Sequence, residues 1–270
     1  MNNSINQSSQ FVSGMLDADY RKALGLSQSS IKEFLKSPAH YLASTEKTSE
    51  PTKAMLFGSA FHAMMLQQNP KDFYAVKLKV DGRTKEGKEY NQNFEQENAG
   101  KIVIDVTEEA TLTAMKESIF AHEVAFNLLK ESTHRETAVF GDFDFNQDTP
   151  VVRLKGLVDL YNENNGVICD LKTCEDASPY GFRKAIWDRR YDIQAVHYSW
   201  LLKNAGKPVS DFVFICVEKE APYAVGCYRI SASSLEKTFE VWNSAIADFC
   251  VCQETGNYPA YSDSIEEIVL

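Results

Sequence analysis

Two aspartates and a lysine occupy positions that packing alone does not explain. Asp159 and Asp170 each end an apolar run, and Lys172 follows Asp170 by two residues on the same face of the same expected strand. An ionised group at the end of a buried strand costs several kcal/mol unless it is paired or bound to a metal. The pattern therefore has two explanations: an Asp–Lys ion pair at a strand end, or a site that holds a divalent cation through carboxylates.

The two aspartates belong to neighbouring expected strands joined by residues 162–166, a strong hairpin signal. Asp159 lies just before this turn, whereas Asp170 lies several residues after it. Both side chains project from one end of a curved sheet only if a bulge or a splay intervenes, and the alternation of apolar residues does not decide this. Glu136 opens the preceding strand and can bring a third acid to the same sheet edge.

Polar residues on two expected helices are further candidates. Gln194 and Tyr198 are four residues apart on an otherwise apolar helix, so they share one face. His62 follows Gly58 by four residues on another apolar helix. Each has a structural alternative, because a histidine on such a helix is often a hydrogen-bonded core residue, and Gln194 and Tyr198 can pack with polar tips.

A basic cluster follows the expected strand that carries Lys172. The segment FRKAIWDRRY contains Arg183, Lys184, Arg189 and Arg190 against a single acid, Asp188. Such a cluster can neutralise DNA phosphates, although an exposed helix face explains it as well. The basic residues between 77 and 88 are a weaker candidate.

The pattern of the chain predicts an α/β fold, in which a mixed sheet flanked by helices follows an N-terminal helical lobe. We expect residues 1–25 to form a flexible arm and residues 26–270 a single domain, divided into a helical lobe (26–132) and a core (133–270). Residues 77–100 are highly charged and predict an exposed insertion. The expected elements are helices within 27–42 (interrupted at Pro38), 51–66, 107–130, 179–203 and 233–254, strands within 135–173, 211–219 and 223–230, and turns at 146–150 and 162–166.

Five motifs occur in the order and spacing of the PD-(D/E)XK nucleases. They are Gly58-x-x-x-His62, Glu136, Gly156-x-x-Asp159, Asp170-x-Lys172 and Gln194-x-x-x-Tyr198. The helical GxxxH and QxxxY motifs resemble the RecB-like branch, and residues 24–270 are similar to the RecE-type exonucleases (exonuclease VIII) of phages and prophages. The resemblance rests also on the segments LSQSSIKEFLKSPAHYL, MLFGSAFHAMML and TGNYPAYSDSIEEIVL. Each motif is weak alone, but five in order are fairly specific.

The resemblance implies a metal-dependent phosphodiesterase. Asp159, Asp170 and the Leu171 carbonyl would hold Mg²⁺, for which Mn²⁺ would substitute, and Glu136 and His62 would complete or support the site. Lys172 would orient the attacking water and stabilise charge on the phosphate, and burial would lower its pKa. Glu136, Gln194 and Tyr198 would serve the catalytic step, the last two by positioning the water, Lys172 or the DNA.

The same resemblance implies an exonuclease that degrades the 5′ strand at double-stranded DNA ends and leaves 3′ single-stranded tails for recombination by annealing. It also implies a homo-oligomeric ring, a tetramer in that family, and a single-strand annealing partner of RecT type. Two alternatives stay open: another RecB-like nuclease, either an endonuclease or a single-strand-preferring enzyme, and a non-catalytic DNA-binding module on the same fold.

The composition of the 270 residues fits a globular domain, because 44% are hydrophobic and 24% charged. The 28 basic and 38 acidic residues give a net charge of -10, which argues against wholesale coating of nucleic acid but not against a local basic groove. The sequence shows neither a membrane-spanning run nor an apolar signal core, so we expect a cytoplasmic protein. Six cysteines without a CxxC pair predict reduced, partly buried thiols, and none precedes Cys169 to complete a four-cysteine cluster.

Overall fold

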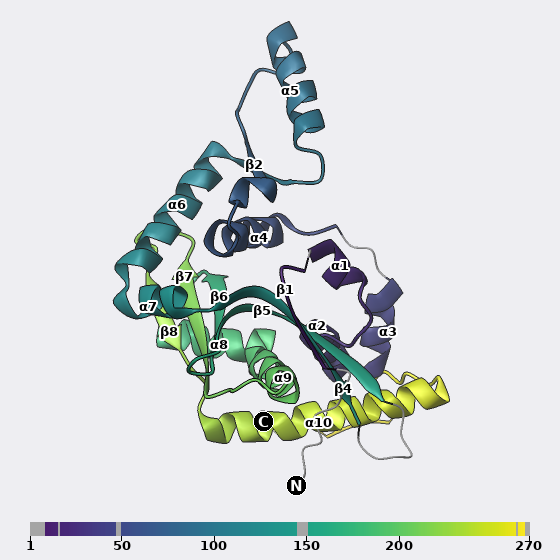
Figure 1. Cartoon of the computed structure of the whole chain (residues 1–270). Helices are drawn as coiled ribbons and strands as arrows, with labels where there is room; N and C mark the ends of the chain where they lie inside the picture. Colours follow the sequence, from purple (N-terminus) through teal and green to yellow (C-terminus); the bar gives the residue numbers. More distant parts are fainter. Residues whose placement is uncertain (1–8, 16, 47–49, 145–150, 263, 268–270) are drawn as a thin grey trace.

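A six-stranded mixed β-sheet forms the centre of the protein (Figure 1). The computed structural model describes residues 9–15, 17–46, 50–144, 151–262 and 264–267. Neighbouring strands are antiparallel except β6 and β7, which are parallel. In spatial order the strands are β1 (Gln10–Ser13), β4 (His134–Phe143), β5 (Val152–Asn162), β6 (Val167–Cys174), β7 (Asp211–Glu218) and β8 (Val225–Tyr228). The predicted fold class is confirmed.

Helices cover both faces of the sheet and enclose two apolar cores, one on each face (Figure 1). The first core lies under α2 (Gln28–Lys36), α8 (Pro179–Arg189), α9 (Tyr191–Asn204) and α10 (Ala232–Thr255). The second lies under α4 (Lys53–Leu66), α6 (Val106–Ala121) and α7 (Glu123–Glu131). Because both faces are covered, β6 and β7 have continuous buried runs rather than alternating ones. No helix in the described part of the chain is long and apolar enough to cross a membrane.

We expected residues 1–25 to form a flexible arm; within the part of it that the structure describes (9–15 and 17–25), a strand and a short helix are docked on the sheet. Strand β1 pairs with β4 at the sheet edge, and Phe11 packs edge-on against His134. The short helix α1 (Asp17–Lys22) ends at the ammonium of Lys155, which donates to the carbonyl of Ala23 at 2.6 Å and to two preceding carbonyls. A cation there satisfies carbonyls that lack a helical partner. The polar composition of the segment gives no sign of these partners because they are distant in sequence.

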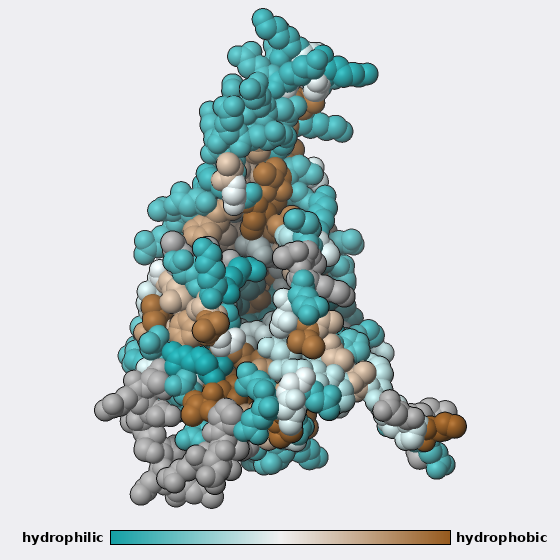
Figure 2. Space-filling model, turned by 90° about the vertical axis from the view of Figure 1, so that its right-hand side faces the viewer, coloured by the Kyte–Doolittle hydropathy of each residue, from teal (hydrophilic) through white to brown (hydrophobic). Residues whose placement is uncertain are grey.

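A charged arm projects from the helical lobe (Figure 1). A 3₁₀ turn (Pro70–Asp72) and the parallel pair β2 (Tyr74–Lys77) and β3 (Ile102–Asp105) form its base. Helix α5 (Lys85–Glu97) extends beyond this pair, and Figure 2 shows a mainly hydrophilic surface there. The arm corresponds to the exposed, charged insertion that the sequence predicts at 77–100.

Each of two expected helices is found as two helices separated by a single residue, at which the chain changes direction. The helix expected over 107–130 divides at His122, whose Nδ1 accepts the Ala125 amide at 3.2 Å and so caps α7. The helix expected over 179–203 divides at Arg190, whose φ of 49° is in the left-handed region. By contrast, the break predicted at Pro38 is found between α2 and α3 (Pro38–Glu46).

The hairpin turn at residues 162–166 is confirmed by a hydrogen bond from the Gly166 amide to the Asn162 carbonyl at 2.8 Å. Gly166 has a φ of 74°, which suits a residue without a Cβ. The turn predicted at 146–150 lies outside the described residues.

Candidate active site and metal centre

Three acids lie in one row across strands β4, β5 and β6. The register of β4 and β5 places Glu136 opposite Asp159. The pairing of β5 with β6 ends at Leu160 and Cys169, one residue before Asp159 and Asp170 would meet, whereas β6 remains paired with β7 along its whole length. The strands therefore splay at the two aspartates, which is one of the two geometries that the sequence left open.

Glu136 has an unusual backbone at its place in this row. Its φ of 44° is in the left-handed region, which is rare for a non-glycine residue inside a strand and is a common feature of functional sites. The side chain of Gln67, at the C-terminal end of α4, donates to Glu136 Oε2 at 3.1 Å. Gln67 carries no motif in the sequence, so its role as a partner of Glu136 appears only in the structure.

His62, Glu136 and Asp159 form a group that can hold a metal ion. One ligand atom from each lies within 4.8 Å of the others. His62 Nε2 donates to the Leu171 carbonyl at 2.9 Å, which leaves Nδ1, 3.7 Å from Asp159 Oδ2, as the free ring nitrogen. Metal-binding histidines usually donate their second ring N–H to a carbonyl in this way. One nitrogen and two carboxylates are a donor set that suits divalent cations, so the residues fit a metal.

The backbone of Leu171 links two members of this group, Asp159 and His62. Its amide donates to Asp159 Oδ2 at 2.9 Å, and its carbonyl accepts from His62. The resemblance implies this carbonyl as a metal ligand. A carbonyl oxygen has two lone pairs, so the hydrogen bond from His62 leaves one for that role.

Asp170 lies outside the His62 group and belongs to a second network. Its Oδ2 pairs with the Lys172 ammonium at 2.5 Å, and its Oδ1 accepts from Gln194 Nε2 at 2.5 Å. The ring of contacts is closed by Lys172, which donates to Gln194 Oε1 at 3.0 Å. The ammonium also lies 4.8 Å from the centroid of the Tyr191 ring. The structure therefore contains the Asp–Lys ion pair that was one of the two explanations of the sequence pattern, and this pair lies beside a group that fits a metal.

Electrostatics distinguishes the two networks. Burial and the neighbouring Asp170 raise the pKa of Asp159 to about 7, although His62 and Lys172 oppose this. We expected burial to lower the pKa of Lys172. Burial does act in that direction, but Asp170 and Asp159 outweigh it, so the pKa of Lys172 is raised above its usual value. Lys172 is therefore a cation at neutral pH.

Tyr198 contacts Gln194 and is not a member of the metal-binding group. Burial raises its pKa well above the usual value, and a hydrogen bond with Gln194 opposes this rise. The ring packs on Gly156, where a Cβ would lie 3.0 Å from two ring carbons. The glycine of the GxxD motif thus has a packing reason. Gly58 has none of this kind, because a Cβ there would meet only Thr173 Oγ1, at 3.8 Å.

The four predicted DNA-binding cations do not share one face. Arg183 and Lys184 are exposed on α8, and Lys184 pairs with Asp188 at 2.5 Å. Arg189 and Arg190 line a hollow between α8 and α2, and Arg190 makes two hydrogen bonds of 3.1 Å to Asp192.

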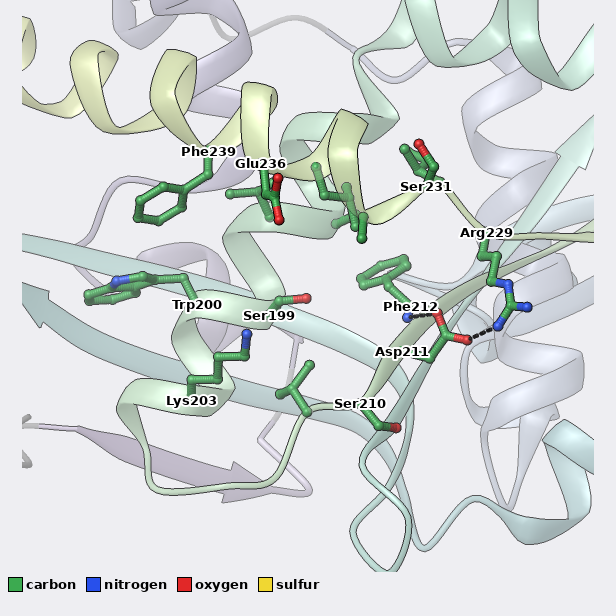
Figure 3. Close-up of a pocket in the computed structure, with 16 residues that line it drawn as sticks. Ser199, Trp200, Lys203, Ser210, Asp211, Phe212, Arg229, Ser231, Glu236 and Phe239 are labelled. Atoms are coloured by element: carbon green, nitrogen blue, oxygen red, sulfur yellow. Dashed lines mark hydrogen bonds and ion pairs between the residues drawn. The ribbon is translucent and has the colours of Figure 1, made fainter.

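A larger hollow of about 750 Å³ lies away from these networks, between α9, α10 and the start of β7 (Figure 3). Of the two acids that line it, Asp211 and Glu236, the first is paired with Arg229 at 2.9 Å. All six cysteines are free; four are buried, and Cys174 and Cys227 are partly exposed, as expected for partly buried thiols. Burial raises the pKa of the Cys169 thiol to about 12, so Cys169 is a poor metal ligand.

The chain matches, over residues 27–269, the family model described as a PDDEXK-like domain of unknown function (DUF3799). The protein belongs to this family. The "Putative exonuclease" of Eubacterium rectale has a similar structure, with a TM-score of 0.58 and 14% identity over 95% of this chain and 96% of that one. At this identity the likeness shows the fold. A phage related exonuclease from Haemophilus somnus 129PT matches at 14% identity over 87% and 97% of the two chains, but its TM-score of 0.35 carries no argument. No curated protein matches the sequence.

The PD-(D/E)XK assignment made from the five motifs is therefore confirmed at the level of family and fold. The family is described as PDDEXK-like, and His62, Glu136 and Asp159, which belong to three of the five motifs, form a group that could hold a divalent cation.

Proposed function

We propose that the protein is a Mg²⁺-dependent exonuclease of RecE type, which degrades the 5′ strand of duplex DNA and leaves 3′ single-stranded tails. The observation that carries the proposal is that two networks lie next to one another at the splay of β5 and β6, close enough for Asp170 and Lys172 to shift the pKa of Asp159. One is the metal-binding group of His62, Glu136 and Asp159, and the other is the pair of Asp170 and Lys172. The polarity of digestion rests on the motif resemblance.

Each side chain of the site has a role in this proposal. Asp159, Glu136 and Nδ1 of His62 would hold Mg²⁺, and Asp170 and the Leu171 carbonyl would complete the set. A bound Mg²⁺ supplies a water of lowered pKa and neutralises charge on the phosphate oxygens.

The polar residues on the side of α9 would bind and orient the substrate. Lys172 is charged at neutral pH, so it can stabilise the negative charge that grows on the phosphate. Gln194 holds both Lys172 and Asp170, and Tyr198 supports Gln194 from behind. Double-stranded DNA ends would be the substrate, and by the same resemblance the chain would act as a homo-oligomeric ring with an annealing protein of RecT type.

The decisive experiment is digestion of a linear duplex labelled separately at its 5′ and 3′ ends, with and without Mg²⁺. We expect early release of the 5′ label, no digestion without a divalent cation, and no cutting of a closed circular duplex. The Asp170→Asn variant serves as the inactive control. Cleavage of the circle would indicate an endonuclease, early loss of the 3′ label would reverse the polarity, and binding without any cleavage would indicate a non-catalytic module.

A further inference from the structure

A second, smaller hollow lies next to the Lys172 network. It has a volume of about 350 Å³ and lies between α2 and the junction of α8 and α9. Its lining is dominated by charged side chains, and the residues are Lys32, Glu33, Leu35, Lys36, Asp188, Arg189 and Arg190. The four basic residues outnumber the two acidic ones, although the whole chain has a net charge of -10.

Lys32 connects this hollow to the candidate active site. It lies on α2, is partly buried, and its ammonium is 5.6 Å from the centroid of the Tyr191 ring. The ammonium of Lys172 is 4.8 Å from the centroid of the same ring. The ammonium groups of Lys32 and Lys172 therefore lie near the same aromatic ring, next to the network of Asp170, Lys172 and Gln194.

Within the described part of the chain, Lys32 makes no ion pair, because the acids around it are engaged by other cations. Glu33 pairs with Lys36 at 2.7 Å, and Asp188 pairs with Lys184. Asp192 accepts hydrogen bonds from two guanidinium nitrogens of Arg190, Nε and Nη2. Asp170 is held by Lys172.

The described part of the chain therefore offers the Lys32 ammonium no ion-pair partner and places the Lys172 ammonium on the same aromatic ring. Burial and the charge of Lys172 lower the pKa of Lys32 to about 7, and the attraction of Asp170 and Asp192 does not compensate. A lysine with a structural ion-pair partner shows the opposite shift. This arrangement is unfavourable alone and becomes favourable when an anion enters the hollow.

We propose that this hollow is a phosphate subsite, in which Lys32, supported by Arg189, binds a backbone phosphate of the DNA strand adjacent to the phosphate that is cleaved. The proposal rests on the proposed nuclease function and deepens it, since it assigns substrate binding to a residue of the N-terminal lobe. A phosphate matches the hollow in charge and forms charge-assisted hydrogen bonds with ammonium and guanidinium groups.

The test compares Lys32→Met and Lys32→Arg with the wild-type protein. DNA affinity is measured across a salt titration with Ca²⁺ in place of Mg²⁺, and cleavage is measured with Mg²⁺. We expect Lys32→Met to weaken binding about tenfold at low salt, to reduce the slope of log affinity against log salt by about one, and to raise KM more than it lowers kcat. Lys32→Arg retains the cation and should recover most of the affinity. The matched control is Lys71→Met, which removes a lysine already paired with Glu109 and should leave the salt slope unchanged.

The outcomes separate this proposal from the proposed function. If the wild-type protein cleaves DNA but Lys32→Met has an unchanged affinity, salt slope and KM, the phosphate subsite is wrong while the nuclease stands. If the wild-type protein does not cleave DNA, the subsite is tested with inorganic phosphate alone. A rise in melting temperature with phosphate that Lys32→Met abolishes would then support the subsite, and an equal response of the two proteins would overturn it.

Discussion

Asp159→Asn should make the metal-free protein more stable at pH 8, although it removes a residue that we assign to metal binding. Asp159 is only 8% exposed, and burial together with Asp170 raises its pKa to about 7. Its Oδ2 accepts the Leu171 amide at 2.9 Å, a hydrogen bond that an asparagine oxygen can also accept. Asparagine therefore imitates the protonated aspartic acid and removes only the buried negative charge.

The magnitude follows from the difference between the folded and unfolded pKa values. An acid whose pKa is raised from 3.8 to about 7 binds more protons in the folded state than in the unfolded state between these pH values. Its protonated form therefore favours the fold at low pH, and the stability it provides is lost as the pH rises from about 4 to about 7. At about 1.4 kcal/mol for each pKa unit, the loss is about 4 kcal/mol, which is on the order of 10 °C in melting temperature.

The assay is thermal unfolding of the wild-type and variant proteins in a chelating buffer at several pH values. We expect melting temperatures that nearly coincide at pH 4 and a variant that melts on the order of 10 °C higher at pH 8. Mg²⁺ should then stabilise the wild-type protein and leave the variant nearly unchanged, because a ligand stabilises only the state that binds it. Asp211→Asn is the control, since it removes a carboxylate that is paired with Arg229 outside the site. If the melting temperatures of the two proteins differed by the same amount at every pH, the charge on Asp159 would not be what destabilises the metal-free fold, and the reasoning would be refuted.

Two further predictions concern Lys172 and the glycine motifs. Lys172→Met leaves Asp170 without its cation, so the metal-free variant should melt at a lower temperature. Mg²⁺ should restore the melting temperature but not the cleavage rate. In single-turnover cleavage this rate should stay about a hundredfold or more below that of the wild-type protein. Full recovery of the rate at high Mg²⁺ would show that Lys172 is only a structural counterion. Gly156→Ala should destabilise the fold by about 1–3 kcal/mol in denaturant titration, because the new Cβ would lie 2.8 Å from Leu201 Cδ1. Gly58→Ala lies in open surroundings on α4, so it should be neutral or stabilise the fold by up to about 1 kcal/mol. Equal effects of the two glycine variants would contradict the packing argument for Gly156.

Local patterns in the sequence were sufficient to predict most helices and strands. The turn at 162–166 and the helix break at Pro38 are both found, since each depends on residues that act within a few positions of the chain. Strand β1 and the break at His122 were not predicted. Strand β1 exists because β4 offers it a hydrogen-bonding edge, and His122 stops one helix while it caps the next. The partner of β1 is distant in the sequence, and the dual cap at His122 lies within a pattern that also suits a continuous helix.

In the candidate site, too, residues with a local signal were predicted from the sequence, and residues whose partners are distant in the sequence were not. Asp159, Asp170 and Lys172 stand out in the sequence because charged residues end apolar strands, and the register of the sheet then brings Glu136 to Asp159. Gln67 and Lys32 have no such signal. Gln67 reaches Glu136 because α4 packs on the sheet, and Lys32 lies in an amphipathic helix, where a lysine ordinarily faces solvent. Their roles depend on how the N-terminal lobe packs, which hydrophobic periodicity does not specify.

The direction of the pKa shifts argues that the site is built for ligands rather than for stability. In a structural ion pair the acid has a lowered pKa and the base a raised one, because each stabilises the charge of the other. Asp159 and Lys32 show the reverse: the pKa of the acid rises to about 7 and that of the lysine falls to about 7. Each charge is unfavourable in the free protein, and neither can be relieved by the Asp170–Lys172 pair, whose charges already neutralise one another. In the function proposed above, a divalent cation beside Asp159 and a backbone phosphate beside Lys32 would each supply the opposite charge that the free protein does not provide there.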